Sequence, residues 1–187
     1  MKPSSWALYF LLPLVLLACA IACGRSTSSS SSPPAVTWTD SSSGLTWQVT
    51  PFANTMDWAD ATSYCQNLAL DGGGWRLPTI SELRTAIRGC VQTETGGSCG
   101  VTDACPDAGA PCDSASCSGC ANGAGPGATC YAPAEFADPC YAAWSSSTAV
   151  GDEHSAWYVD FTRGYVAVNA EAASGYGTNF PYVRCVR

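Results

Sequence analysis

Cysteine is the residue type that most constrains what this chain can fold into. Twelve of its 187 residues are cysteines, and eight of these fall within residues 90–140. Glycine, alanine, proline, serine and aspartate fill the rest of that segment, and large apolar residues are scarce. The segment therefore has too little apolar surface to fold by burial, and we expect cross-links to hold it together. The eight cysteines are Cys90, Cys99, Cys105, Cys112, Cys117, Cys120, Cys130 and Cys140. They can pair in many ways, and the sequence alone selects none of them.

Residues 1–23 have the pattern of an export signal. Lys2 precedes an apolar stretch that ends near Ala18 and is shorter than the roughly 20 residues needed to span a bilayer. A small residue followed by cysteine occurs twice, at Cys19 and at Cys23, and both sites resemble the lipobox of bacterial lipoproteins. Leu16 favours lipidation of Cys19, whereas the even number of cysteines that follow favours Cys23. Both sites stay open, and an ordinary secretory signal is the alternative.

Residues 24–35 predict a flexible linker between this signal and a folded domain. Serine, threonine and proline dominate the stretch, which has almost nothing to bury. No later segment is long and apolar enough to span a membrane, so we expect lipid to be the only membrane attachment. The small residue after either candidate cysteine suggests sorting to the outer membrane of a Gram-negative host.

Residues 36–187 are expected to form one domain of about 150 residues. The chain after the signal contains arginine but no lysine, and it is clearly acidic, with 15 Asp and Glu in total against 8 Lys and Arg. This charge argues against nucleic acid or sulfated polymers as partners. Neutral or cationic ligands fit better.

The first half of the domain predicts a hairpin and a helix. Residues 36–39 and 45–49 alternate between apolar and polar side chains around a serine-rich turn. Residues 57–68 have apolar residues three and four apart, which is typical of a helix with one buried face. That face comprises Trp58, Ala61, Cys65 and Leu68. Cys65 is therefore expected to point toward the core.

A second helix has the clearest local signals. Thr79 and Glu82 match the T-x-x-E capping box, in which each side chain binds a backbone amide of the other residue. Gly89 stands where a left-handed residue would end the helix. The expected buried face comprises Ile80, Leu83 and Ile87.

The last part of the chain predicts strands. Residues 141–147 resume strand-like character, and residues 156–161 and 165–168 flank a turn as a second hairpin. Trp157, Val159 and Phe161 are expected to face inward. Residues 182–187 alternate again and predict a final strand.

This order of elements resembles the C-type-lectin-like fold, with α+β architecture, two helices, a small antiparallel sheet and a disulfide-rich insert at residues 90–140. The sequence motifs within these elements are similar to those of the DUF1566 family, which is also named for the C-terminal domain of the Legionella collagen-like adhesin. The motifs that carry the resemblance are Gly44-Leu45-Thr46-Trp47, Trp58-Ala59-Asp60-Ala61, Trp75-Arg76-Leu77-Pro78-Thr79, Trp144-Ser145-Ser146-Ser147, Trp157 with Asp160-Phe161, and Tyr182-Val183-Arg184-Cys185-Val186-Arg187. The match covers roughly residues 40–187 apart from the insert.

The resemblance implies a bacterial surface protein that acts as a recognition or adhesion module. It also implies a disulfide between Cys65 and Cys185, which leaves the eight insert cysteines to pair among themselves. The adhesin that gives the family its name binds glycosaminoglycans through basic surface, and an acidic domain without lysine should not do so. Calcium-dependent sugar-binding lectins carry Glu-Pro-Asn and Trp-Asn-Asp triplets, and neither occurs here.

Metal and redox chemistry have weaker signals. Cys117 and Cys120 form a C-x-x-C pair, which is typical of half a zinc site or of a redox pair, but export favours structural disulfides. Asp103, Asp107 and Asp113 could supply oxygens to calcium, although they match no ligand pattern. We therefore expect no cofactor and no metal, with calcium left as an open alternative.

Catalysis has little support in the sequence. The single histidine, His154, stands near no nucleophile motif. Formylglycine-generating enzymes share a related fold and an R-L-P-T segment, but Leu83 stands where they have tryptophan. We expect the chain not to be an enzyme, with an enzyme of that kind as the alternative.

The candidate ligand site follows from the resemblance. Ligands of this fold usually meet the loops between the middle strands, which points to residues 148–155 and to the insert. The residues expected to bind are Asp152, Glu153, His154, Tyr158 and Tyr165. The ligand would be a glycan or a protein surface of unknown identity. A structural or assembly lipoprotein of the envelope, without a soluble ligand, is the alternative.

Overall fold

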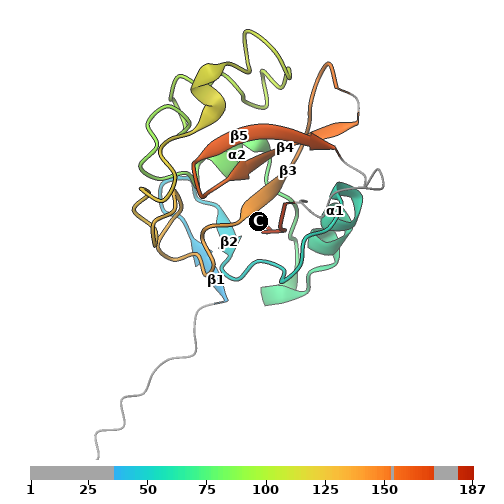
Figure 1. Cartoon of the computed structure of the whole chain (residues 1–187). Coiled ribbons are helices and arrows are strands. Elements are labelled where there is room, and N and C mark those ends of the chain that lie inside the picture. Colours follow the sequence, from blue (N-terminus) through green and yellow to red (C-terminus); the bar gives the residue numbers. More distant parts are fainter. Residues whose placement is uncertain (1–35, 153, 171–180) are drawn as a thin grey trace, which may run out of the picture. The chain divides into compact units, whose positions relative to one another are not determined.

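Short helices and strands joined by long cross-linked loops make up this chain. A computed structural model describes residues 36–152, 154–170 and 181–187 (Figure 1). The elements are β1 (Thr37–Thr39), β2 (Thr46–Gln48), α1 (Trp58–Asn67), the 3₁₀ turn η1 (Leu70–Gly72), α2 (Ile80–Arg84), the 3₁₀ turn η2 (Ala115–Ser118), β3 (Ala142–Thr148), β4 (Ser155–Asp160) and β5 (Tyr165–Ala170). The architecture is α+β, as expected. The export signal with Cys19 and Cys23, the linker and Glu153 lie outside the described residues.

Two small antiparallel sheets confirm both predicted hairpins. In the first sheet β1 pairs with β2, and Trp38 lies opposite Trp47. In the second, β4 lies between β3 and β5. The inward-facing residues of β4 and the turn after it are buried as expected, with Trp157, Val159 and Phe161 at most 2% exposed.

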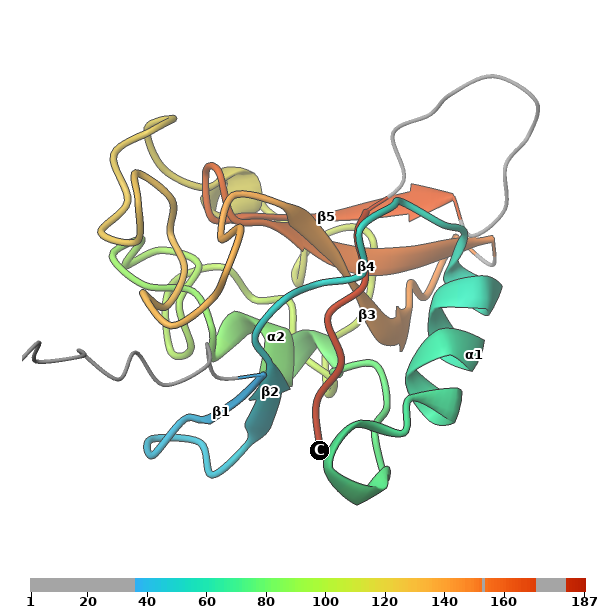
Figure 2. The ribbon, with the colours of Figure 1, turned by 90° about the horizontal axis from the view of Figure 1, so that it is seen from below.

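Helix α1 forms where the apolar spacing predicts it. The Asp57 carboxylate caps its first turn by accepting from the Asp60 amide at 2.8 Å. Ala61 and Cys65 are buried. The indole N–H of Trp58 donates to the Ser145 carbonyl at 2.7 Å, which ties the helix to β3. Both views place α1 and the insert at opposite ends of the three-stranded sheet (Figure 1; Figure 2).

Helix α2 has the predicted capping box but ends sooner than predicted. The Thr79 hydroxyl accepts from the Glu82 amide at 3.2 Å, and the Glu82 carboxylate accepts from the Thr79 amide at 2.8 Å. After Arg84 the backbone amides bind carbonyls three residues back, so the helix tightens into turns well before Gly89. Ile87 is nevertheless buried, and Gly89 has the expected positive φ of 84°. Beyond the helix the Thr85 hydroxyl donates to the Glu82 carbonyl at 2.6 Å, and the buried Arg84 side chain binds the insert.

The C-terminal segment is not the strand that we predicted. Residues 181–187 are extended, but they change partners along their length. Tyr182 pairs in parallel with Ala143, whereas Val186 bridges both Trp47 and Arg76. No neighbour runs beside the segment long enough for a regular ladder. Instead the segment passes from β3 to β2 and joins the two sheets (Figure 2).

Five disulfides cross-link the domain. Cys65 bonds to Cys185, with 5.5 Å between their Cα atoms, and this bridge ties α1 to the C-terminal segment. Three of the insert bridges are nested and the fourth closes a separate loop: Cys90–Cys120, Cys99–Cys117, Cys105–Cys112 and Cys130–Cys140. Cys117 and Cys120 therefore belong to different bridges. Their C-x-x-C spacing makes no redox pair and offers no thiolate to zinc.

The insert takes more part in the hydrophobic core than its composition predicts. Its two largest apolar side chains, Tyr131 and Phe136, are 3% and 4% exposed. The Phe136 ring meets Trp38 at 5.8 Å and Trp47 at 5.6 Å between ring centroids, both edge-on. A third ring, Phe161, lies 6.4 Å away. The insert is thus both cross-linked within itself and anchored to the first hairpin by an aromatic side chain.

None of the helices among the described residues is long and apolar enough to cross a membrane.

Candidate functional site

A groove lies between the first hairpin and the insert, and we call it the hairpin–insert groove. Its main part has a volume of about 500 Å³. The hairpin contributes Trp38, Asp40 and Ser42, the segment after α2 contributes Arg88, and the insert contributes Pro126, Gly127 and residues 132–135. The groove continues for about 390 Å³ between Thr37 and residues 134–137. Trp38, Ala134 and Glu135 line both parts.

Asp40 organises one end of this groove. The residue is 4% exposed, and its carboxylate accepts hydrogen bonds from the Ser42 amide (3.0 Å), the Ser42 hydroxyl (2.7 Å) and the Ser43 hydroxyl (3.0 Å). The Arg88 guanidinium lies 3.2 Å away. Burial opposes the charged form, but the serine bonds and Arg88 outweigh it, so the pKa of Asp40 lies below its ordinary value. Asp40 is thus committed to holding the hairpin turn.

The groups left for a ligand are aromatic and acidic. Trp38 is half-buried and forms one wall, and Ser42 and Glu135 are exposed. In the described part of the chain, Glu135 forms no ion pair, whereas Asp138 acts electrostatically on the buried Arg184. Arg88 is neutralised by Asp40. The groove therefore combines an apolar wall with a net negative charge.

Arg184 fixes the wall that the insert contributes. Its side chain is 3% exposed and donates to the carbonyls of Gln48 (2.8 Å), Val49 and Ala137 (2.9 Å). Its guanidinium carbon lies 3.9 Å from the centre of the Phe136 ring. Burial lowers the pKa of Arg184 to about 9. One side chain thus ties β2, the insert and the C-terminal segment together beside the groove.

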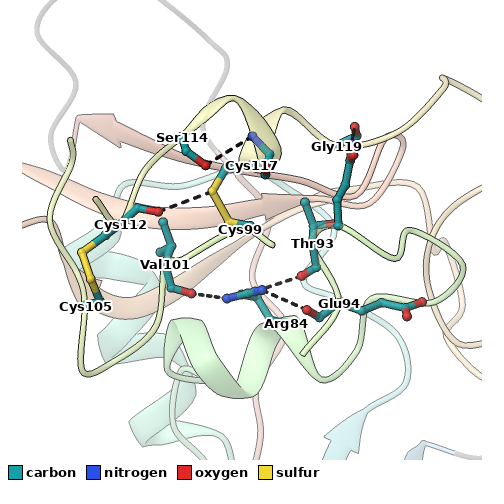
Figure 3. Close-up of a disulfide and its surroundings, with 12 residues drawn as sticks. Arg84, Thr93, Glu94, Cys99, Val101, Cys105, Cys112, Ser114, Cys117 and Gly119 are labelled. Atoms are coloured by element: carbon teal, nitrogen blue, oxygen red, sulfur yellow. Dashed lines mark hydrogen bonds between the residues drawn. A yellow bond between two sulfur atoms is a disulfide. The ribbon is translucent and has the colours of Figure 1, made fainter. Parts of the chain in front are cut away.

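Arg84 plays the same part at the start of the insert (Figure 3). It is 3% exposed and donates to the carbonyls of Thr93 (2.9 Å), Glu94 (2.9 Å) and Val101. Burial lowers its pKa. Figure 3 shows the Cys99–Cys117 bridge directly beside these loops. The first turns of the insert are therefore fixed from two sides.

The residues that the sequence predicts as the ligand site do not gather in one place. Asp152 and His154 are exposed in the turn before β4, and Glu153 lies outside the described residues. Tyr158 and Tyr165 lie on the sheet with their ring centroids 6.3 Å apart. Four residues of extended strand, roughly 13 Å, separate His154 from Tyr158. Burial raises the pKa of Tyr158 to about 12, consistent with a packing role for this side chain.

The loop before β4 does meet the insert. The Val150 amide donates to the Pro106 carbonyl at 2.9 Å, and the Ala108 amide donates to the Val150 carbonyl at 3.0 Å. Asp107 and Asp152 are both exposed in this region. The loop and the insert are therefore in direct contact, and residues 106–108 and 148–155 do not line the groove.

Metal binding gains no support from the described residues. Among them, one group of potential metal ligands lies close together, namely Cys105, Asp107 and Cys112, and its two cysteines are bonded to each other. Asp103 instead accepts hydrogen bonds from the Thr79 hydroxyl at 2.7 Å and the Ser147 hydroxyl at 3.2 Å. It ties the insert to α2 and β3. Asp113 does not join either group.

Sequence reasoning missed the groove because its two walls are 90 residues apart in the chain. The Asp40–Ser43 stretch identified a turn, and nothing in it indicated which segment would lie opposite. Glu135 and Asp138 belong to the insert, and its path could not be predicted because the sequence did not determine how its cysteines pair.

Comparison with known proteins supplies the family. Residues 36–187 match the family model of the Lcl C-terminal domain. The chain belongs to this family. The family is that of the C-terminal domain of the Legionella collagen-like protein and suggests adhesin-like surface proteins. No curated protein matches the chain, and no solved structure matches it either.

Proposed function

We propose that this Lcl C-terminal domain is an exported recognition module that contacts its ligand in the hairpin–insert groove. The observation that carries the proposal is the groove itself, whose walls are held by Arg184, Phe136 and the insert disulfides. A rigid scaffold that presents a preformed groove loses little entropy when a ligand binds. Membership of an adhesin-like family supports the same reading.

The proposal includes attachment to the outer membrane through a lipid on Cys19 or Cys23. Its support is the signal pattern of residues 1–23 and the linker that follows. The linker would let the groove reach away from the membrane surface. We also propose a C-type-lectin-like fold, supported by the Cys65–Cys185 bridge between the first helix and the C-terminal segment.

The charge of the surface narrows the ligand class. Residues 36–187 contain six arginines. Two of them, Arg84 and Arg184, are buried, and three more are paired with carboxylates: Arg76 with Glu82, Arg88 with Asp40 and Arg187 with Asp71. Arg163, on the β4–β5 turn, is exposed. Because five of the six arginines are buried or paired, the described residues form no basic cluster. The proposal therefore favours neutral or cationic ligands over sulfated polymers.

We propose that the domain is not an enzyme. All ten cysteines from Cys65 to Cys185 are bonded in pairs, and a formylglycine-generating-like reaction would require a reactive thiol. One alkylation-sensitive cysteine of low pKa in the oxidised domain would reverse this reading.

A groove-filling variant tests the proposed site. Ala134 is exposed and lines both parts of the groove, so Ala134→Trp fills it without removing a hydrogen bond. Ala104→Trp, at an exposed position of the insert away from the groove, is the matched control. Both proteins and the parent would be applied to a glycan array and to a panel of purified extracellular-matrix proteins, in calcium and again in chelator.

The expected result is a saturable ligand whose binding Ala134→Trp abolishes and Ala104→Trp preserves. A ligand that resists Ala134→Trp but is lost when Asp152 and His154 are changed to alanine would move the site to the loop before β4. Blank screens with all proteins folded would favour the alternative, a structural lipoprotein of the envelope.

A further inference from the structure

The outer edge of β1 carries backbone groups without partners among the described residues. On the β2 side, the Val49 amide donates to the Val36 carbonyl at 3.0 Å, and the Asp40 amide donates across the turn at 2.9 Å. Hydrogen-bonded and non-hydrogen-bonded pairs alternate along an antiparallel ladder, so the N–H and C=O groups of Thr37 and Thr39 point away from β2. None of these four groups forms a hydrogen bond in the described part of the chain.

At the opposite edge of the same hairpin, the outward-facing backbone groups of β2 bind another segment of the chain. The outward-facing Thr46 amide donates to the Arg187 carbonyl at 2.9 Å, and the Arg187 amide donates back to the Thr46 carbonyl at 2.9 Å. The Gln48 amide donates to the Cys185 carbonyl at 2.9 Å. β2 therefore already accepts an extended segment, the C-terminus of this chain. β1 offers the same pattern with no segment beside it among the described residues.

The hairpin–insert groove is lined in part by the same strand and the residue after it. Thr37, Trp38 and Asp40 line one side of it, and Glu135 lies on the insert side. Proteins protect open edges with proline, lysine, bulges or a covering segment. β1 has the sequence Thr-Trp-Thr and uses none of the first three, and Thr39 is exposed.

We propose that the groove binds an extended, cationic peptide segment of a partner protein by adding it to β1 as a third strand. This inference rests on the proposed function and specifies the ligand class of its site. Outward groups of Thr37 and Thr39 are two residues apart, about 6.6 Å, which matches alternate residues of an extended peptide. Four backbone hydrogen bonds become available in this way.

The charge of the groove selects the side chains of the peptide. Glu135 lies in the groove and forms no ion pair in the described part of the chain, whereas Asp138 acts electrostatically on the buried Arg184. A lysine or arginine of the peptide would meet the Glu135 carboxylate, whereas an acidic peptide would be repelled. Trp38 lines the same groove as Glu135, so the apolar stems of the basic side chains would pack against its ring.

One pair of variants isolates the backbone contribution of β1. Thr39→Pro removes an outward N–H without touching the bonds to β2, and proline is tolerated on edge strands at such positions. Thr39→Val is the matched control, because it loses the same hydroxyl contact to Thr46 (2.8 Å) and keeps the N–H. The probe is a fluorescein-labelled seven-residue peptide of alternating valine and lysine, measured by fluorescence polarisation with residues 36–187. This segment carries both hydrophobic cores and all five disulfides.

The expected result is saturable binding by the parent and by Thr39→Val, with affinity at least tenfold weaker for Thr39→Pro. A peptide N-methylated at alternate residues should bind the parent at least tenfold more weakly than the unmethylated peptide. This measurement uses only the parent protein, so it does not depend on the folding of a variant. Glu135→Gln should weaken binding about threefold at low salt, with less effect at high salt. Equal affinity of Thr39→Pro and Thr39→Val, equal binding of the N-methylated peptide, or equal binding of an alternating valine–glutamate peptide would each overturn the proposal.

Two further results would also overturn strand addition to β1. They test this inference separately from the proposed recognition function. Sedimentation that shows a dimer, dissociated by Thr39→Pro, would assign the β1 edge to a second copy of this chain. A glycan that binds in the groove and is lost in Ala134→Trp, with no binding of any peptide, would keep the recognition site and reject strand addition.

Discussion

Replacing Arg84 by methionine should weaken the domain more than any surface arginine does. Arg84 is almost completely buried and supplies hydrogen bonds to the carbonyls of Thr93, Glu94 and Val101. Methionine keeps much of the apolar stem and removes every donor. The first turns of the insert then lose the group that holds them against α2 (Figure 3).

The size of the effect follows from the three carbonyls. Thr93 and Val101 are fully buried, so their carbonyls cannot recover a partner from water, whereas that of Glu94 is partly exposed. An orphaned buried acceptor costs about 1–3 kcal/mol, and hydrogen bonds from a charged donor sit at the upper end of that range. Relief from burying the guanidinium charge offsets part of the loss. We expect a net loss of about 4 kcal/mol, and a fall in Tm of roughly 8–16 °C for a domain of this size.

Arg76→Met is the matched control. Arg76 stands eight residues earlier and forms a two-point ion pair with Glu82, at 2.6 Å for both contacts, but its side chain is 47% exposed. Such a surface pair is worth less than about 1 kcal/mol. Guanidinium unfolding followed by tryptophan fluorescence, with the disulfides intact, would compare the two. A loss for Arg84→Met below about 1.5 kcal/mol, or equal to that of Arg76→Met, would refute the reasoning.

Three other perturbations have defined outcomes. Replacing Cys65 and Cys185 together by alanine should lower the free energy of unfolding by about 5 kcal/mol in chemical denaturation, because the bridge closes a sequence separation of 120. Gly119→Ala should lower the stability by about 1–3 kcal/mol more than Gly123→Ala in the same assay. Both glycines have positive φ, but a Cβ at 119 would meet backbone atoms of the β4–β5 turn, whereas one at 123 meets nothing within 4 Å. The Asp40 carboxylate should stabilise the parent over Asp40→Asn above pH 3.8, and this difference should shrink as the pH falls below that value, because its folded pKa is lowered.

Elements that depend on local physics could be predicted from the sequence. The Thr79–Glu82 capping box and the two hairpins each rest on residues within a few positions of one another. Short-range hydrogen bonds and side-chain periodicity determine such elements whatever lies around them. The buried face of α1 followed from spacing alone.

The features that we missed depend on contacts between distant segments. The buried Arg84 side chain at the end of α2 binds carbonyls 9 and 17 residues further along. The C-terminal segment is not a strand because its partners change from β3 to β2. The groove is set by where Phe136 docks on Trp38 and Trp47, which lie 98 and 89 residues earlier in the chain. None of these long-range contacts can be predicted from the local amino-acid composition.

The buried arginines connect the architecture of this domain with the charge of its surface. Loops that lack the regular backbone hydrogen bonds of a sheet or helix leave many carbonyls without an amide donor. A guanidinium can supply such donors, because it carries five N–H groups in one plane. Arg84 and Arg184 serve six carbonyls in this way, without an ion-pair partner among the described residues. A chain with six arginines in its domain and no lysine thereby takes a third of its positive charge out of the surface. The groove stays acidic as a consequence of how the insert is held, and a cationic partner is the chemical complement of that arrangement.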